Sequence, residues 1–153
     1  MDTFIAIDIG ASSGRLMMSQ WDDQQLSLTE IHRFKNSFRH HAGFDRWHID
    51  YLIKEILIGL EKVKHGGIQS CDVGIDTWAV DYCLIDDKGQ RLGDPVAYRD
   101  KRTNHVIERF SQEYSLQTLY EKTGIQLQPF NTIFQLYVED KNLLAKADKL
   151  LLI

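Results

Sequence analysis

The chain has 153 residues, of which 43% are hydrophobic and 26% are charged, a balance typical of one globular domain with a substantial core. A formal net charge of −4 without any basic stripe argues against a nucleic-acid or membrane partner, and no apolar run reaches membrane-spanning length. Cys71 and Cys83 are expected to be small buried residues in a reducing compartment, and no signal-peptide pattern precedes them, so we expect a cytoplasmic protein.

The first predicted element is an apolar strand, Thr3–Ile9, which carries one acidic residue, Asp8, inside a hydrophobic run. It leads into the turn Gly10–Gly14, whose two glycines are expected to allow positive φ and close approach to a ligand. A second strand, Arg15–Trp21, follows directly, so this is no P-loop. A carboxylate for a hydrated cation beside free N–H groups predicts a site for a nucleotide's phosphate tail. An ordinary Asp-x-Gly turn is the alternative.

The next segments extend this start into a meander and a helix. Leu26–Phe34 is expected to be a third antiparallel strand, and the polar segment Asn36–Arg46 an exposed loop. A helix follows, with Asp50 as its expected N-cap and apolar residues at helical spacing as far as Val63. The pair Gly66–Gly67 is expected to end it.

The second half alternates short strands and helices. In chain order we expect strands over Val73–Asp76 and Val80–Ile85, a hairpin turn at Asp86–Gly89, an extended Val96–Asp100, helices over Asn104–Tyr114 and Leu116–Lys122, a helix capped by Asn131, and a buried strand from Lys149 to Ile153. The order βββαβαβ predicts an α/β fold on the ribonuclease-H-like plan, a mixed sheet flanked by helices. Because the sequence stops on an aliphatic run, we expect it to be the front part of a longer protein.

Two groups of residues in this plan could carry chemistry. Asp8 and Asp76 are expected on neighbouring strands, where they could share a divalent cation directly or through water; alternatively, Asp76 only caps the turn after it. Trp78 and Asp81 flank Ala79, and an aromatic plate beside a hydrogen-bond acceptor suits a polyhydroxylated sugar. The alternatives are a core tryptophan and a strand charge that points to water.

Other polar residues give weaker indications. The charged run around Arg99, Asp100 and Arg102 is either a solvated run that caps the next helix or a loop that contacts a ligand. The histidines show no zinc spacing, and the two serines of the glycine-bounded turn lack a histidine partner nearby, so a zinc site and a serine hydrolase are not favoured.

Five segments together resemble one family, the FGGY carbohydrate kinases of the actin-like ATPase superfamily, and within it the rhamnulokinase branch. They are Asp8–Arg15, Glu30–Phe34, Gly74–Asp81, Pro95–Asp100 and Pro129–Thr132. The resemblance spans the chain in order. It implies ATP- and Mg²⁺-dependent phosphorylation of the 1-hydroxyl of L-rhamnulose, a step in rhamnose catabolism.

The resemblance also implies roles for individual residues. The residues that match the ATP-phosphate loop are Ala11, Ser12, Ser13, Gly14 and Arg15. Asp8 matches the carboxylate that holds magnesium through water. The residues that match the sugar-facing wall are Trp78, Ala79, Asp81, Phe130 and Asn131. Ala79 stands where the family commonly shows glycine, and its methyl group is expected to narrow the sugar pocket slightly.

By the same resemblance, residues 1–153 correspond to the N-terminal part of the first actin-like domain, and the second domain is absent from this chain. The family's general-base aspartate and adenine pocket are expected beyond residue 153, so we expect this portion alone to be inactive. The alternatives are an FGGY kinase for xylulose, fuculose or glycerol, a ribonuclease-H-like metal-dependent nuclease, and a non-catalytic actin-like module. The sequence does not indicate an oligomeric state.

Overall fold

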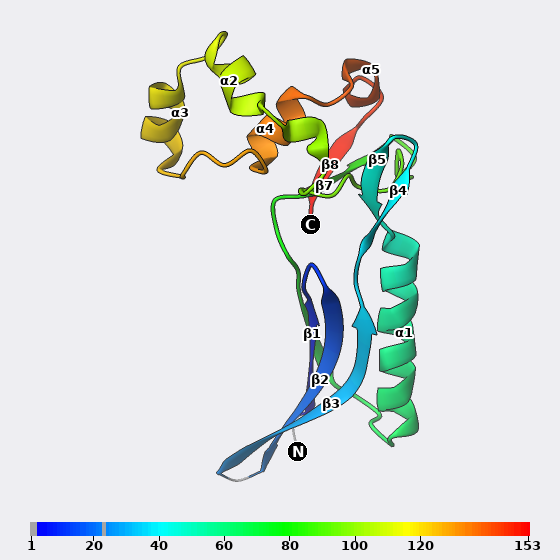
Figure 1. The fold of residues 1–153 in the computed structure, drawn as a ribbon. Helices are drawn as coiled ribbons and strands as arrows, with labels where there is room; N and C mark the ends of the chain where they lie inside the picture. Colours follow the sequence, from blue (N-terminus) through cyan, green and yellow to red (C-terminus); the bar gives the residue numbers. More distant parts are fainter. Residues whose placement is uncertain (1–2, 23) are drawn as a thin grey trace. The chain divides into compact units, whose positions relative to one another are not determined.

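The structure is a computed structural model that describes residues 3–22 and 24–153, drawn as a ribbon in Figure 1. These residues divide into two units. Unit 1 contains the segment that ends at Phe38 together with His48–Trp78, and unit 2 contains Arg39–Trp47 and Ala79–Ile153.

Unit 1 is built on a four-stranded sheet with the order β3-β2-β1-β6. β1 (Thr3–Ile9) pairs antiparallel with β2 (Ser13–Asp22), and β2 pairs antiparallel with β3 (Gln25–Lys35). β6 (Asp72–Asp76) joins the other side of β1 in parallel. The predicted meander of three strands, the predicted strand Val73–Asp76 and the mixed character of the sheet are confirmed.

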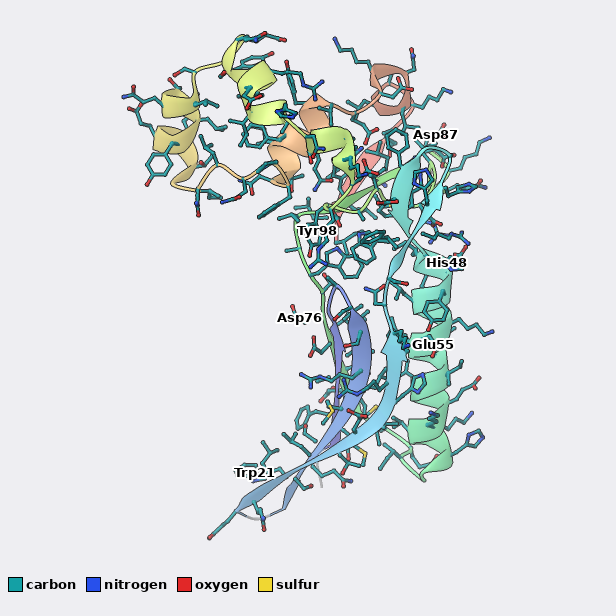
Figure 2. All side chains as sticks on the ribbon, in the orientation of Figure 1. Trp21, His48, Glu55, Asp76, Asp87 and Tyr98 are labelled. Atoms are coloured by element: carbon teal, nitrogen blue, oxygen red, sulfur yellow. The ribbon has the colours of Figure 1, made fainter. Side chains whose placement is uncertain are left out.

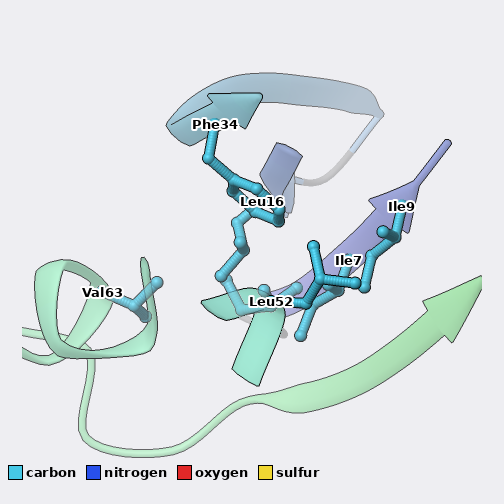
Figure 3. Close-up of a cluster of buried hydrophobic side chains, with 7 residues drawn as sticks. Ile7, Ile9, Leu16, Phe34, Leu52 and Val63 are labelled. Atoms are coloured by element: carbon cyan, nitrogen blue, oxygen red, sulfur yellow. The ribbon is translucent and has the colours of Figure 1, made fainter. Parts of the chain in front are cut away.

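One face of this sheet is covered by α1 (Ile49–His65), which lies along the strands in Figure 1. Alternate residues of β1 are buried, as a half-buried strand requires. The cluster of buried side chains, shown in Figure 3, consists of Ile5, Ile7, Ile9, Leu16, Phe34, Leu52 and Val63. Gly59 permits the close approach of α1, because a Cβ there would overlap the Leu16 side chain.

The ends of α1 agree with the sequence in one case and differ in the other. The predicted N-cap at Asp50 is wrong: His48 occupies the N-cap position without a side-chain cap, and Asp50 lies in the first turn, where a carboxylate favours the helix dipole. Gly66 and Gly67 end the helix as predicted, and Gly67 has a left-handed φ of 90°.

The prediction of a loop over Asn36–Arg46 is wrong, although most of the segment is exposed as expected. The segment forms a hairpin of β4 (Phe38–His41) and β5 (Phe44–Trp47). Its turn residues Ala42 and Gly43 have φ of 51° and 84°, the two left-handed values that a tight two-residue hairpin turn needs. The strands carry polar and charged residues, so hydrophobic alternation did not reveal them.

β7 (Tyr82–Ile85) and β8 (Lys149–Leu152) form a separate antiparallel pair in unit 2. β7 starts later than predicted because Ala79 and Val80 have left-handed φ of 64° and 65°, which a strand cannot contain. The turn at Asp86–Gly89 is confirmed. The side chains of β8 are exposed in the described chain, although a buried strand was expected.

The rest of unit 2 consists of short helices: η1 (Lys101–Thr103), α2 (Val106–Ser111), α3 (Leu116–Thr123), α4 (Thr132–Tyr137) and α5 (Lys141–Leu144). Val106, Phe110 and Phe134 form their small buried cluster. The extended segment predicted to reach Asp100 is wrong beyond Val96, since Asp100 N donates to Ala97 O in a turn. None of the described helices has both the length and the apolar character needed to cross a membrane.

Candidate functional site

The β1–β2 turn is held by its own backbone and by Asn36. Gly10 N donates to Ser13 O at 2.9 Å, which closes the turn. Asn36 Nδ2 donates to Gly10 O at 2.8 Å, and Asn36 N donates to Ser12 O at 3.0 Å. Asn36 is buried, and the sequence analysis missed it, although asparagine side chains often brace nearby turns.

This turn presents backbone donors. Within residues 3–22 and 24–153, the amides of Ala11 and Ser12 donate no hydrogen bond, and Ser12 is exposed. Backbone N–H groups of successive turn residues can bind an anion such as a phosphate. Three of the predicted phosphate residues, Ser13, Gly14 and Arg15, are the first residues of β2, and all five predicted residues therefore lie on one hairpin.

The expected positive φ at the two glycines of this turn is wrong, whereas the close approach to a ligand stays a prediction. Neither Gly10 nor Gly14 has a left-handed φ. A Cβ on Gly14 would instead overlap the ring of Phe34 on β3, so this glycine makes room for a core side chain. Its requirement comes from packing under the turn.

Asp8 lies between Arg15 and Asp76 on adjacent strands of the sheet. Asp8 is in register with Arg15 across β1–β2 and with Asp76, the last residue of β6 (Figure 2), across β1–β6. Arg15 Nε and Nη2 lie 2.9 and 2.8 Å from Asp8 Oδ2. The predicted placement of the two aspartates on neighbouring strands is confirmed. Asp8 does not carry the cost of a lone buried carboxylate, because its side chain is 44% exposed and paired with Arg15.

Asp8 and Asp76 suit a hydrated Mg²⁺ ion. Among the described residues, no group of three or more His, Cys, Asp or Glu side chains could hold a metal ion. Mg²⁺ usually keeps several of its water molecules and uses one or two carboxylates, which Asp8 and Asp76 can supply. Asp76 makes no hydrogen bond to the turn after it among the described residues, which disfavours the capping alternative.

Asp81 is fully buried in unit 2. Its Oδ2 accepts from Trp47 Nε1 at 2.6 Å and from Tyr98 N at 3.2 Å, and its Oδ1 accepts from Gln135 Nε2 at 3.0 Å. The alternative interpretation of Asp81 as a charge that points to water is therefore wrong. A direct contact between Asp81 and a sugar stays a prediction.

Trp78 and Ala79 precede this carboxylate in the chain. Trp78 is half-buried and packs against the core cluster of unit 1, as in the alternative of a core tryptophan. Ala79 is exposed, and its left-handed φ explains why glycine would suit the position. No local sequence signal predicts this conformation.

The second predicted sugar-facing segment, Phe130 and Asn131, lies beside Val80 within unit 2. Phe130 contacts Tyr98 edge to face at a centroid distance of 6.0 Å. Asn131 is at the N-cap position of α4, but its Nδ2 donates to Gln126 O instead of capping the helix. Val80 and Asn131 both line an apolar hollow of about 270 Å³ beside α4.

In the charged run Arg99–Arg102, Asp100 and Arg102 have structural partners, whereas Arg99 is exposed. Asp100 is buried, and its two carboxylate oxygens accept from Asp45 N and Arg102 N, both at 2.7 Å. The Arg102 side chain is nearly buried and pairs with Glu139 at 2.8 Å. The helix-capping interpretation is confirmed for Asp100, and the description of the run as solvated is wrong for Arg102.

Glu139 also accepts a hydrogen bond from the Tyr82 hydroxyl at 2.5 Å. Burial acts to raise the pKa of Glu139, but hydrogen bonds from Tyr82 and Arg102 and the charge of Arg102 outweigh it, so the pKa lies below its usual value. Burial, together with the bond to Glu139, raises the pKa of Tyr82. This carboxylate is held ionised as part of the framework of unit 2.

Solved structures show what class of fold this arrangement belongs to. The fold matches that of a ligand-bound xylulose kinase from Lactobacillus acidophilus with a TM-score of 0.79 at 11% identity, over 98% of this chain and 31% of that one. It matches a Plasmodium falciparum glycerol kinase solved with ADP with a TM-score of 0.70 at 17% identity, over 95% of this chain and 30% of that one. The chain thus has the α/β fold seen in sugar kinases.

The family follows from the sequence. The model of the N-terminal domain of the FGGY family of carbohydrate kinases matches residues 3–153, and the chain belongs to this family. It is 57% identical to a rhamnulokinase from Enterococcus faecalis over 99% of this chain, and 53% identical to one from Bacillus subtilis over 98%. In both cases the chain spans 31% of the relative's length.

Proposed function

We propose that residues 1–153 are the N-terminal part of the first actin-like domain of a longer, cytoplasmic sugar kinase, which transfers a phosphoryl group from ATP to the 1-hydroxyl of L-rhamnulose. The observation that carries this proposal is the 53–57% identity to proteins named rhamnulokinase over at least 98% of the chain. The donor-bearing β1–β2 turn beside two aspartates supports it, because phosphoryl transfer needs positioned phosphates and a cation.

In this proposal the β1–β2 hairpin binds the phosphates of ATP. The amides of Ala11 and Ser12 donate to phosphate oxygens, and the residues as far as Arg15 complete the loop. Asp8 holds Mg²⁺ through water with Asp76 beside it; when bound, the cation neutralises charge on the phosphates. The Asp8–Arg15 ion pair is half exposed, so its rearrangement around MgATP costs little.

The sugar is proposed to contact Trp78, Ala79, Phe130 and Asn131, with Asp81 as an acceptor for one sugar hydroxyl. Aromatic rings stack on the apolar face of a sugar, and amide and carboxylate groups bond its hydroxyls. Asp81 already accepts from Trp47, Tyr98 and Gln135, so a sugar hydroxyl would replace or share one of these hydrogen bonds. Apart from ATP and Mg²⁺, the proposal needs only the small-molecule ketose as a partner.

The chain by itself is proposed to be inactive. This chain is proposed to position phosphate and cation, while the base for the attacking hydroxyl and the adenine pocket are proposed to lie further along the full-length protein. A ribonuclease-H-like nuclease is disfavoured by the net charge of −4 and the absence of a basic stripe in the sequence. Another sugar as substrate remains the nearest alternative.

A coupled ADP-release assay on the full-length protein tests the proposal with L-rhamnulose, L-fuculose, D-xylulose and glycerol, and with this chain alone in parallel. We expect strong preference for L-rhamnulose and no turnover by the chain alone. Preference for another sugar would overturn the substrate, and turnover by the chain alone would overturn the proposed division of the site.

A matched pair of variants tests the cation role in the same assay. Asp8→Asn removes the proposed carboxylate and is expected to lower kcat/KM at least about 100-fold and to raise the Mg²⁺ concentration needed for half-maximal rate. Asp87→Asn, in the exposed turn after β7, is the control and should leave both unchanged. Equal behaviour of the two variants would contradict the cation role of Asp8.

A further inference from the structure

Gln135, which is fully buried on α4, joins the two segments of unit 2 that the proposed sugar site uses. Its Nε2 lies 3.1 Å from Val80 O, 3.0 Å from Asp81 Oδ1 and 2.9 Å from Phe130 O. Its Oε1 accepts from Arg102 Nη2 at 3.0 Å. One amide therefore connects the segment at residues 79–81 with the segment at residues 130–131, although they are about fifty positions apart in the chain.

The first of these segments has an unfavourable backbone. Ala79 and Val80 both have left-handed φ, a conformation that is costly for any residue with a Cβ and most costly for a β-branched one such as Val80. Such backbone persists only where surrounding contacts fix it, and it is concentrated at functional sites. Thr132 supplies a second such contact, because its Oγ1 donates to Val80 O at 2.7 Å.

We propose that Gln135 and Thr132 are positioning residues, which hold Ala79 and Phe130 in the geometry that the sugar needs. The inference rests on the proposed function, since Ala79 and Phe130 face the sugar only in that proposal. Gln135 acts through two backbone carbonyls and the Asp81 carboxylate, and Thr132 acts through the Val80 carbonyl. All of these groups belong to unit 2, whereas the proposed phosphate hairpin belongs to unit 1. Loss of either side chain should therefore weaken sugar binding selectively.

Steady-state kinetics of the full-length protein test this with Thr132→Val, which keeps the shape and removes the hydrogen bond. The KM for the ketose is expected to rise about five- to tenfold, the effect of one lost hydrogen bond, while the KM for ATP changes less than about twofold. Thr132→Ser keeps the hydroxyl and should restore the wild-type KM. Thr118→Val on α3, where the side chain is exposed, is the matched control and should change neither value.

Two further variants keep the test decisive. Gln135→Met has a similar volume and removes all the bonds of the amide, so it should raise the ketose KM beyond the effect of Thr132→Val; if it does not fold, the Thr132 series still decides. Val80→Gly relieves the unfavourable φ at the residue whose carbonyl Thr132 bonds, because glycine adopts left-handed φ freely. In that background, Thr132→Val should change the ketose KM less than about twofold.

The outcomes separate this inference from the proposed function. If the wild-type protein phosphorylates none of the four sugars, the proposed function is wrong and the positioning role falls with it. If the wild type is active and the variants lower only the unfolding temperature, or raise both KM values equally, the positioning role is wrong and the function stands. A selective rise in the ketose KM that Thr132→Ser reverses supports both.

Discussion

Units 1 and 2 hold their proposed ligand segments in different ways. In unit 1 the regular ladders of β1, β2 and β6 place Asp8, Arg15 and Asp76 side by side, and the side chains of Asp8 and Arg15 are nearly half exposed. In unit 2 the turn at residues 79–81 is irregular, and buried side chains such as Asp81 and Gln135 fix it. The regular sheet leaves the side chains proposed to bind ligands exposed, whereas the irregular turn is held by buried polar side chains.

The largest test of this contrast is Asp81→Ala in unit 2. The change removes the carboxylate that accepts from the buried donors of Trp47, Tyr98 and Gln135, of which Gln135 keeps its two backbone-carbonyl acceptors. We expect the free energy of unfolding of the full-length protein to fall by about 3–5 kcal/mol, measured by urea denaturation. Asp87→Ala in an exposed turn should change it by less than about 0.5 kcal/mol. A loss for Asp81→Ala as small as that of the control would show that the network does not hold unit 2.

The contrast also explains what the sequence could predict. The strands β1, β2 and β3 and helix α1 were predicted to within a few residues, because long runs with Ile5 or Leu52 on one face follow strand or helix periodicity. The β4–β5 hairpin was missed, since its polar strands lack alternation and depend on the turn at Ala42 and Gly43. Regular packing against one core leaves a local signal, and polar hairpins leave little.

The same holds for the proposed sites. The phosphate hairpin and the neighbouring aspartates follow from residues a few positions apart or on adjacent strands, so their placement was predicted. The burial of Asp81 depends on Trp47, 34 positions earlier, and on Gln135, 54 positions later. No local pattern encodes such partners, and the left-handed φ of Ala79 and Val80 is likewise set by tertiary contacts.

A second test asks whether packing or backbone freedom requires Gly14 in unit 1. Gly14→Ala should lower the free energy of unfolding by about 1–3 kcal/mol, because the new Cβ overlaps the Phe34 ring. In a Phe34→Leu background the same change should cost less than about half as much, since the ring is gone. Thermal unfolding of the four proteins completes this double-mutant cycle. An equal cost in both backgrounds would point to backbone strain at Gly14 instead of packing.

A third test uses pH to probe the framework of unit 2. The pKa of Glu139 is lowered below its ordinary 4.5 in the folded state, so its ionised form adds stability above that pH, which is lost as pH falls through the folded pKa. Glu139→Gln should therefore reduce the free energy of unfolding by about 1–2 kcal/mol near pH 7. The difference from wild type should shrink on acidification toward about pH 3.

Urea midpoints measured across that range check this expectation. Glu108→Gln, at an exposed position on α2, is the control and should follow the wild-type curve closely. A difference between Glu139→Gln and wild type that stays constant or grows as pH falls would contradict the sign of the shift at Glu139.

The smallest expected effect comes from a change in unit 2 that relieves backbone strain, whereas the variants above remove contacts or add a clash. Ala79→Gly relieves a left-handed φ of 64°, worth about 1–2 kcal/mol, and adds chain entropy to the unfolded state, worth about 0.4–1 kcal/mol. The balance is a gain of about 0.5–1 kcal/mol, visible as a higher unfolding temperature. Ala145→Gly, at an ordinary φ of −66°, should instead lower that temperature. If Ala79→Gly is also destabilising, the network of unit 2 does not hold its turn against strain, and the left-handed backbone at Ala79 needs another cause.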